Sequence, residues 1–302
     1  MNALDRMADT LAREGLSTSQ DAPLAKKTWW RVGGPADLWV EAGDRRGLAR
    51  VMSLAHEEGV PVFVLGNASN LLVSDKGIRG VVVRLVGELA GAAQVDRTLT
   101  LGGGARLVQL LKRAEREGWT GLEMLAGIPG TVGGAVVMNA GTRLGELSDA
   151  LIDVDLVLAD GEHGTATVDD LHMSYRHSEL PEGAVVAAAR VRLSDEDPAE
   201  AFAHVREHLE YRARTQPVDV PTCGSTFRNP EGNTAGRLIE SCGLKGTRIG
   251  GAQVSEKHAN FLVNTGGATA TELRDLIDHV RATVAERTGV LLRPEVVLAG
   301  EW

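Results

Sequence analysis

Two stretches rich in Gly, Ser, Asn and Thr constrain this chain more than any other feature. The first is the turn Gly66–Asn70, which follows an apolar run, and the second extends from Gly127 to Gly141. Loops of this composition expose backbone N–H groups and let a phosphate approach without a Cβ clash. The segment Gly102–Gly104 does not fit the GxGxxG fingerprint between a strand and a helix, and the P-loop pattern is absent. A single loop of this kind would indicate a tight turn, whereas two differently built loops predict a bound dinucleotide.

The charge and the cysteines exclude several classes of protein. The formal net charge of -9 and the pI of about 5.4 argue against nucleic acid as the main partner. Residues 1–15 predict a short amphipathic helix rather than a signal peptide, and no apolar run approaches the ~20 residues that span a bilayer. The two cysteines, Cys223 and Cys242, form no CxxC pair and suit a reducing compartment. We therefore expect a cytoplasmic protein with no metal and with no nucleic-acid or membrane partner. Independently of these features, we expect a monomer.

The order of the predicted elements indicates an α+β protein with three units, at residues 1–90, 91–194 and 195–302. In the first unit a helix is expected between its N-cap Asp44 and Gly59, with strands at 38–41, 61–65, 71–73 and 81–85. In the second a helix is expected from Leu107 to Gly118, with strands at 98–101, 154–158 and 185–193. The third has a helix after Asp197-Pro198, a helix at 271–287 with the capping box Thr269-x-x-Glu272, and a last strand at 295–298.

The glycine loops and several further segments resemble the family of UDP-N-acetylenolpyruvoylglucosamine reductases. Leu65–Val73 and Gly127–Gly141 are similar to the two flavin loops of that family. Three more segments match motifs of its substrate site, in order and spacing: Tyr175–Ser178, Gly224–Pro230 and Pro294–Val296. The resemblance covers the chain from Trp30 to its end. It implies a two-subdomain FAD-binding fold of the vanillyl-alcohol-oxidase (PCMH) type, followed by a C-terminal α/β substrate-binding domain.

The resemblance implies non-covalently bound FAD, with NADPH as the co-substrate. The residues that it assigns to the cofactor are Gly66, Asn67, Ala68, Ser69, Asn70, Gly127, Ile128, Pro129, Gly130, Thr131, Gly133, Gly134, Asn139 and Gly141. The family usually has Gly where Ala68 stands. Because alanine resists positive φ, we expect Ala68 to adopt a conformation permitted to it, with a slightly weaker pyrophosphate contact. No separate nicotinamide fold is visible, so NADPH and substrate are expected to use one pocket in turn, with ping-pong kinetics.

The resemblance also implies three catalytic residues for the reduction of an enolpyruvyl ether on a UDP-sugar to UDP-N-acetylmuramate, for peptidoglycan synthesis. Hydride added at C3 leaves negative charge at C2 that spreads into the carboxylate. Arg176, a planar and permanent cation, is expected to bind this carboxylate. Ser225 is expected to donate a proton to C2, and Glu295 to assist the enediolate as the neutral acid.

Six further residues are candidates for binding the substrate. They are Tyr175, Arg214, Arg228, Asn229, Gln253 and Lys257. Arg228 stands where the family usually has Lys. Both are cations, but arginine does not lose its proton and presents a planar fork, so the substrate geometry is expected to differ slightly.

Each catalytic candidate also has a plain structural interpretation, and two other functions are compatible with the fold. Taken alone, Ser225 would be a turn serine, Arg176 a surface ion-pair partner and Glu295 an edge-strand carboxylate. Their occurrence together in matching motifs favours catalysis. Two alternatives are an FAD-dependent oxidase of the same fold and a nucleotide-sugar sensor without activity. Neither glycine loop contains a histidine of the kind that binds FAD covalently in many such oxidases, and retention of the three catalytic candidates argues against a sensor.

Overall fold

The computed structural model of the chain describes residues 2–302, which divide into two compact units. The first unit holds the segments up to residue 22, 37–67 and 80–209, and the second holds 23–36, 68–79 and 210–302. The fold class is α+β, as predicted. Two segments of the N-terminal third therefore belong to the same unit as the C-terminal residues. The three domains predicted at 1–90, 91–194 and 195–302 stay a prediction.

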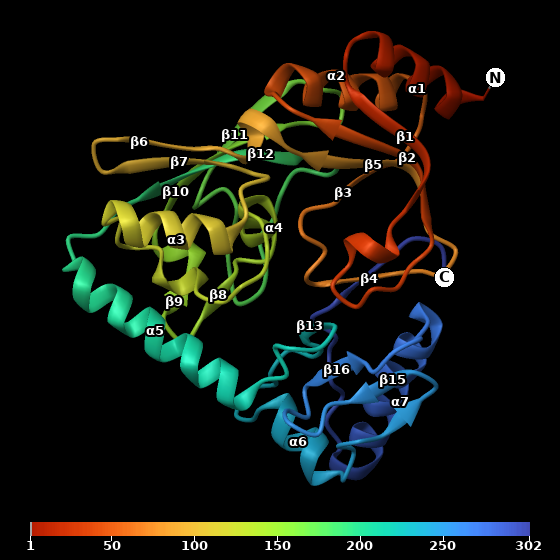
Figure 1. Cartoon of the computed structure of the whole chain (residues 1–302), viewed down its shortest axis with the longest axis vertical. Coiled ribbons are helices and arrows are strands. Elements are labelled where there is room, and N and C mark those ends of the chain that lie inside the picture. The colour runs from red at the N-terminus through yellow and green to blue at the C-terminus, as the bar shows by residue number, and fades with distance from the viewer. Residues whose placement is uncertain (1) are drawn as a thin grey trace. The chain divides into compact units, whose positions relative to one another are not determined.

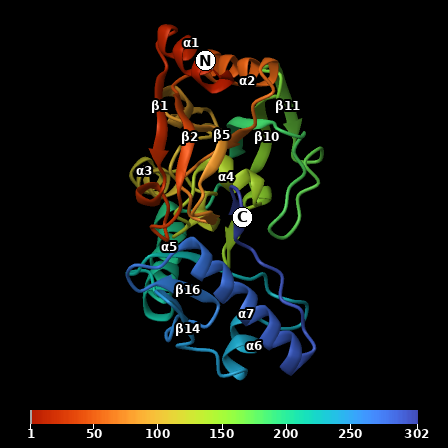
Figure 2. The same cartoon turned by 90° about the vertical axis from the view of Figure 1, so that its right-hand side faces the viewer.

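The first unit contains a sheet whose strands run in the order β1-β2-β5-β3. Their bounds are β1 Ser17–Pro23, β2 Pro35–Ala42, β5 Ile78–Leu85 and β3 Val62–Val64. Helices α1 Ala3–Arg13 and α2 Arg45–Glu57 pack against this sheet (Figures 1 and 2). Leu11 of α1 and Val51 of α2 share one core with Val81 and Val83 of β5. Asp44 caps α2 as predicted, because its carboxylate accepts a hydrogen bond from the Gly47 N–H at 2.7 Å.

A second, antiparallel sheet in the same unit has the order β11-β10-β12-β7-β6. Its strands are β11 His163–Thr167, β10 Leu151–Val157, β12 Val185–Arg192, β7 Thr98–Gly102 and β6 Ala92–Val95. Helices α3 Leu107–Glu117 and α4 Val132–Val137 lie on one side of it (Figure 1). Gly118 ends α3 with φ 73°, as predicted. A small hairpin of β8 Gly141–Thr142 and β9 Gly145–Glu146 follows α4.

The second unit is built on the sheet β13-β16-β15-β14. Its strands are β13 Thr222–Ser225, β16 Phe261–Asn264, β15 Ala252–Val254 and β14 Arg248–Ile249, and its helices are α6 Ala235–Ser241 and α7 Ala270–Thr288. The predicted capping box of α7 is confirmed, since Thr269 and Glu272 bond to each other's backbone N–H. Asp75 also accepts hydrogen bonds from the N–H groups of Ala270 and Thr271, both at 2.9 Å. Helix α5 Pro198–Thr215 links the units in sequence.

The final strand differs from its prediction. It was expected at 295–298, but β17 comprises Val297–Ala299 and pairs in parallel with β4 Leu71–Val73. Glu295 lies before this strand, and its N–H donates to the Thr226 carbonyl at 2.8 Å instead of pairing with β4. The chain around Glu295 thus pairs with the segment after β13 before it joins β4. This connection brings Glu295 next to the Ser225 segment.

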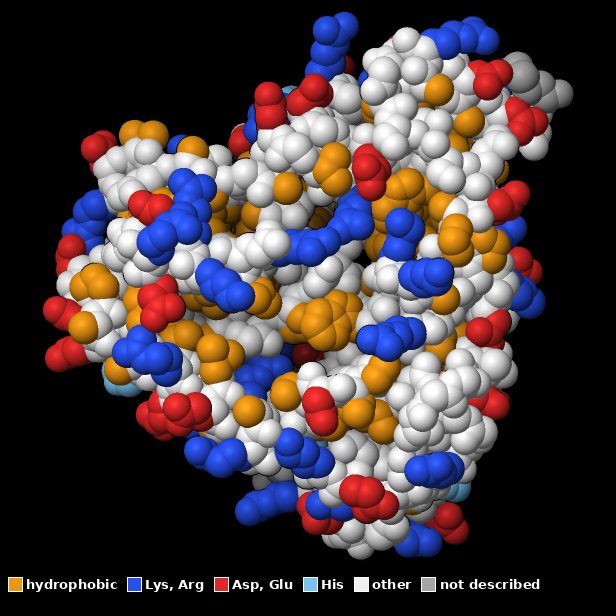
Figure 3. Space-filling view, viewed as in Figure 1, with side chains coloured by type: hydrophobic (Ala, Val, Ile, Leu, Met, Phe, Trp, Pro, Cys, Tyr) orange, Lys and Arg blue, Asp and Glu red, His pale blue; other side chains and the backbone are white. Residues whose placement is uncertain are grey.

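Figure 3 shows both acidic and basic side chains around the edge of the visible face, and several basic side chains in its middle. Among the described residues, no helix combines the length and the apolar character needed to cross a membrane.

Candidate active site

The start of the first glycine loop, Gly66 and Asn67, lies against the second glycine loop in the first unit. A Cβ at Gly66 would lie only 2.5 Å from the Thr131 hydroxyl oxygen, so the Thr131 side chain would have to shift. The side-chain amide of Asn67 donates a hydrogen bond to the Pro129 carbonyl. The second loop is also fixed to the segment after β7, because the Gly133 N–H donates to the Gly103 carbonyl at 2.7 Å. Glycine at position 66 therefore lets the two loops approach closely without displacing the Thr131 hydroxyl.

Backbone N–H groups of these loops are available to an acceptor from outside the protein. In the part of the chain that the structure describes, the N–H groups of Asn67, Ala68 and Ser69 donate no hydrogen bond. Ala68 has φ 48°, in the left-handed region; the expectation that alanine avoids positive φ here is wrong. A left-handed residue in a turn makes successive N–H groups converge on an anion. The pyrophosphate of FAD supplies acceptor oxygens of this kind, so the residues present fit the cofactor.

Arg176 lies in a tight turn of the first unit. Ser174 and His177 exchange two backbone hydrogen bonds of 3.0 Å, which leaves Tyr175 and Arg176 as the central residues. Arg176 has φ 56°, a conformation that costs a residue with a side chain roughly 1–2 kcal/mol. Strained residues of this kind concentrate at functional sites. The backbone at residue 176 therefore has a conformation that would suit glycine better, yet it carries an arginine side chain.

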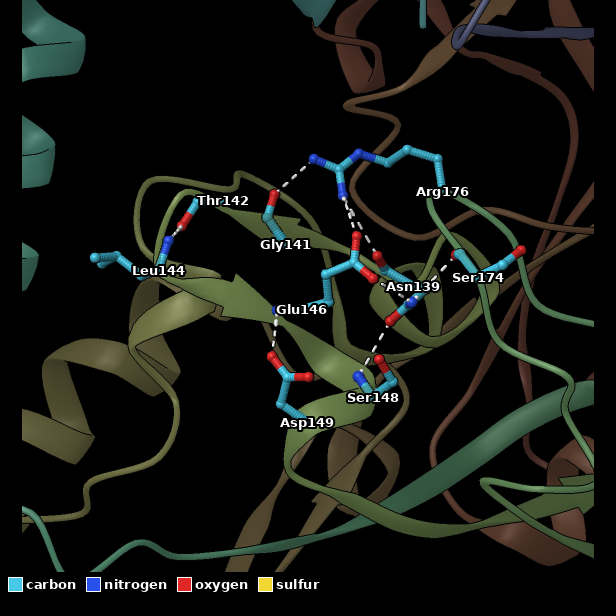
Figure 4. Close-up of polar contacts among 9 residues, drawn as sticks. All are labelled: Asn139, Gly141, Thr142, Leu144, Glu146, Ser148, Asp149, Ser174 and Arg176. Carbon is cyan, nitrogen blue, oxygen red and sulfur yellow. Dashed lines mark hydrogen bonds and ion pairs between the residues drawn. The ribbon is translucent and has the colours of Figure 1, made fainter. Parts of the chain in front are cut away.

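The guanidinium of Arg176 is fixed by the hairpin that follows α4 (Figure 4). Nη2 donates to the Gly141 carbonyl at 2.8 Å, and Nη1 lies 3.5 Å from the Asn139 carbonyl oxygen. Nη1 also lies 3.8 Å from Oε1 of Glu146. The guanidinium carbon lies 4.9 Å from the centre of the Tyr175 ring, within cation–π distance. These contacts orient a permanent positive charge.

Asn139 is the buried centre of this network. Its side-chain nitrogen donates to Glu146 Oε2 at 2.9 Å and to the Ser174 carbonyl at 3.1 Å, and its side-chain oxygen accepts from the Ser148 N–H at 3.1 Å. Asn139 also has φ 37°, which asparagine tolerates better than most residues. The amide therefore joins the hairpin to the turn that carries Arg176. Asn139 and Gly141 are predicted cofactor residues, and their contacts with Arg176 were not predicted from the sequence.

The second unit places the other two catalytic candidates close together. Ser225 ends β13 opposite Phe261 of β16 and is half-buried. The carbonyl of the next residue, Thr226, accepts the N–H of Glu295 at 2.8 Å. The Asn70 side chain donates to the Glu295 carbonyl at 3.0 Å, which joins this segment to the first glycine loop. The predicted proton donor and the predicted acid are thus connected through one backbone hydrogen bond.

The substrate-binding candidates have different surroundings. Tyr175, Arg214, Asn229 and Lys257 are exposed, whereas Arg228 and Gln253 are half-buried. Lys257 donates to the Ala213 carbonyl at 2.6 Å. The Asn229 side chain accepts the Ala235 N–H at 3.0 Å, before α6. Within residues 2–302, no group of His, Cys, Asp and Glu side chains has the arrangement of a metal site.

Cys223 lies two residues before the predicted proton donor, Ser225, and its burial can be tested. Its thiol lies 3.3 Å from the Leu71 carbonyl oxygen, and Cys223 and Cys242 are both buried and unpaired. Burial raises the pKa of the Cys223 thiol, which keeps it neutral and unreactive. We predict that a disulfide reagent such as Ellman's reagent labels neither cysteine of the native protein at about pH 8, and labels both after unfolding. Rapid labelling of the native protein would contradict this burial.

The same shift in pKa predicts how stability depends on pH. The folded-state pKa of Cys223 lies above the unfolded value of about 8.5. The neutral Cys223 thiol therefore contributes fully to the free energy of unfolding below about pH 8.5. Above that pH the unfolded state gains stability by ionising, so the free energy of unfolding should fall by up to about 1.4 kcal/mol per pH unit. Denaturant unfolding at several alkaline pH values should show this decline in the wild type and a smaller decline in Cys223→Ala. Equal slopes would contradict the assignment.

Comparisons with known proteins agree with this arrangement. Residues 36–167 match the family described as FAD binding domain, and residues 216–299 match UDP-N-acetylenolpyruvoylglucosamine reductase, C-terminal domain. A UDP-N-acetylenolpyruvoylglucosamine reductase from Anaeromyxobacter dehalogenans (strain 2CP-C) is 50% identical over 283 residues, 94% of this chain and 86% of that protein. The corresponding reductase 2 from Symbiobacterium thermophilum is 46% identical, over 92% of this chain and 91% of that protein. The crystal structure of UDP-N-acetylenolpyruvylglucosamine reductase from Thermus caldophilus matches with a TM-score of 0.81 and 38% identity, over 94% of this chain and 98% of that chain.

Proposed function

This chain belongs to the family of UDP-N-acetylenolpyruvoylglucosamine reductases, and from that premise we propose that Arg176, Ser225 and Glu295 perform the family's reaction. The chain is an FAD-containing oxidoreductase that reduces the enolpyruvyl ether of UDP-N-acetylenolpyruvoylglucosamine to UDP-N-acetylmuramate in peptidoglycan precursor synthesis. NADPH is the reductant used by this family. The two glycine loops, Gly66–Asn70 and Gly127–Gly141, would hold FAD, which would supply C3 of the enolpyruvyl group with the hydride that comes from NADPH.

Arg176 binds the carboxylate of the enolpyruvyl group. When C3 is reduced, negative charge develops at C2 and spreads into this carboxylate. A guanidinium fits a carboxylate through two parallel hydrogen bonds and remains charged throughout. The observation that carries the proposal is that Arg176 is already held in place, by the Gly141 carbonyl at 2.8 Å and by a turn with φ 56°. A charge fixed before the reaction stabilises the transition state without reorganisation.

Ser225 donates the proton that C2 receives. A serine hydroxyl is a weak acid, so it acts only on a basic carbanion and where its alkoxide is stabilised by neighbouring dipoles or cations. Glu295, joined to the Ser225 segment through Thr226, assists the enediolate by donating a hydrogen bond as the neutral acid. Six residues bind the rest of the UDP-sugar: Tyr175, Arg214, Arg228, Asn229, Gln253 and Lys257. The positive charges of the arginines and the lysine suit its diphosphate.

The proposal is tested by the product that the enzyme makes in heavy water. Purified protein loaded with FAD is incubated with NADPH and UDP-N-acetylenolpyruvoylglucosamine in D2O. We expect UDP-N-acetylmuramate with deuterium at C2, because the proton added there comes from an exchangeable hydroxyl. Oxygen consumption with an alcohol, and no such product, would instead indicate the oxidase. Binding of the UDP-sugar by a protein that takes up no flavin would indicate the sensor.

We also propose that the enzyme works as a monomer in the cytoplasm. Its two buried, unpaired cysteines suit a reducing compartment. Sedimentation at micromolar concentration should give the mass of one chain, 32.0 kDa. Twice that mass would contradict the monomer.

A further inference from the structure

Glu146 is an acidic residue that the mechanism above does not use, although its carboxylate lies beside the proposed catalytic cation. Its Oε1 is 3.8 Å from Arg176 Nη1, and its Oε2 accepts a hydrogen bond from Asn139 Nδ2 at 2.9 Å (Figure 4). We propose that Glu146 is a positioning residue, which holds the Arg176 guanidinium in the orientation that receives the enolpyruvyl carboxylate. This inference rests on the role proposed for Arg176.

The backbone of Glu146 is rigid enough for such a role. Glu146 ends β9, where it pairs with Gly141 of β8. A Cβ at Gly141 would meet the Gly145 carbonyl oxygen at 2.3 Å, so the two strands approach more closely than other residues allow. The Glu146 N–H also donates to Asp149 Oδ2 at 2.8 Å. Main chain and side chain are thus both constrained.

The distance between Glu146 and Arg176 allows the carboxylate to orient the guanidinium without forming a hydrogen bond to it. At 3.8 Å the two charged groups attract each other, but the separation is too long for a hydrogen bond. Glu146 therefore does not occupy a donor of the guanidinium. The side chains of Arg176 and Glu146 are 18% and 32% exposed, so their attraction is less screened by water than that of an exposed pair. In this proposal the carbonyls of Asn139 and Gly141 fix where the Arg176 guanidinium lies, and the carboxylate of Glu146 fixes the orientation of its plane.

The first variant is Glu146→Gln, which keeps an oxygen for the Asn139 amide and removes the charge. We expect the reoxidation of reduced flavin by saturating UDP-N-acetylenolpyruvoylglucosamine to slow by about tenfold, and by up to about 100-fold in Glu146→Ala, because small misplacements of a catalytic group have effects of this size. The affinity of the oxidised enzyme for substrate, read from the flavin spectrum, should change by less than about threefold, since the variant also loses a carboxylate that repels the substrate. Flavin reduction by NADPH and the melting temperature should stay at wild-type values.

A matched control is Glu207→Gln. Glu207 pairs with Arg143, in the turn of the same hairpin, at 3.1 Å, and it is exposed. Loss of this exposed pair should leave both half-reactions unchanged, because exposed ion pairs contribute little. A slowed reoxidation in Glu207→Gln would show that any change of charge near the hairpin has the effect, and it would overturn the specific role of Glu146.

A double-mutant cycle with Arg176→Lys decides whether Glu146 acts through Arg176. If it does, Glu146→Gln slows the wild type but adds less than about twofold to Arg176→Lys. Equal slowing in both backgrounds would overturn the positioning role and leave that of Arg176 intact. Loss of flavin or slower reduction by NADPH in Glu146→Gln would overturn the positioning role, because it would show that the substitution disturbs the structure in general. A wild-type reoxidation rate in Arg176→Lys itself would instead refute the proposed function of Arg176, on which the inference rests.

Discussion

Replacing Ser225 with alanine is expected to slow the reoxidation of reduced flavin by UDP-N-acetylenolpyruvoylglucosamine by about 10²–10⁴-fold, the range associated with a lost general acid. The change removes one hydroxyl from the half-buried end of β13 and leaves the two glycine loops intact. FAD should therefore remain bound and yellow, and NADPH should still bleach it at the wild-type rate. Stopped-flow absorbance separates the two half-reactions and measures each rate directly.

The control for this variant is Ser241→Ala. Ser241 lies at the end of α6 in the same unit, and its hydroxyl donates to the Leu238 carbonyl at 2.9 Å. Both half-reactions should proceed there at wild-type rates. If Ser225→Ala loses FAD or is no longer reduced by NADPH, Ser225 has a structural role and the proton must come from another group.

Replacing Arg176 with lysine is expected to have an effect of similar size, about 10²–10³-fold on the same half-reaction. Lysine keeps the charge but has neither the planar fork nor the reach to use the Gly141 and Asn139 carbonyls as Arg176 does. The developing enediolate would then face a mobile point charge. Flavin reduction by NADPH does not generate this charge, so its rate should stay near the wild-type value in single-turnover measurements.

Arg190→Lys is the matched control, because Arg190 in β12 is an exposed arginine that pairs with Asp153. This substitution should leave both rates unchanged. An Arg176→Lys enzyme that reoxidises as fast as the wild type would show that the fixed guanidinium is dispensable. Equal slowing of both half-reactions would assign Arg176 to flavin binding instead.

The long elements of this fold could be predicted from the sequence because their signals are local. Helix α7 has an apolar stripe, a capping box and Gly289 at its end, and the structure has it at Ala270–Thr288. The elements that were missed lack such signals. Strand β1, with the sequence STSQDAP, buries only Ala22, and α4, with the sequence VGGAVV, resembles a glycine loop. Both form because the tertiary structure supplies partners that the local sequence does not encode.

The candidate site was predictable to the extent that its residues lie in contiguous motifs. The loop Gly66–Asn70 and the segments around Arg176, Ser225 and Glu295 could all be identified in this way. Backbone conformation could not, as the left-handed φ of 48° at Ala68 shows. The link from Glu146 to Arg176 was also missed, because it joins residues far apart in sequence through the buried side chain of Asn139. The one signal available in the sequence was the position of the acidic residue Glu146 shortly after the motif Asn139-Ala140-Gly141.

The most direct test of the whole account is a two-step titration of the purified, FAD-loaded protein without oxygen. NADPH is added first while the flavin absorbance is followed, and UDP-N-acetylenolpyruvoylglucosamine is added second. We expect NADPH to bleach the flavin, and the substrate to restore its colour with the formation of UDP-N-acetylmuramate. Flavin that bleaches but never recovers its colour with this substrate would contradict the assigned reaction. A protein that cannot take up FAD would contradict the cofactor site built from the two glycine loops.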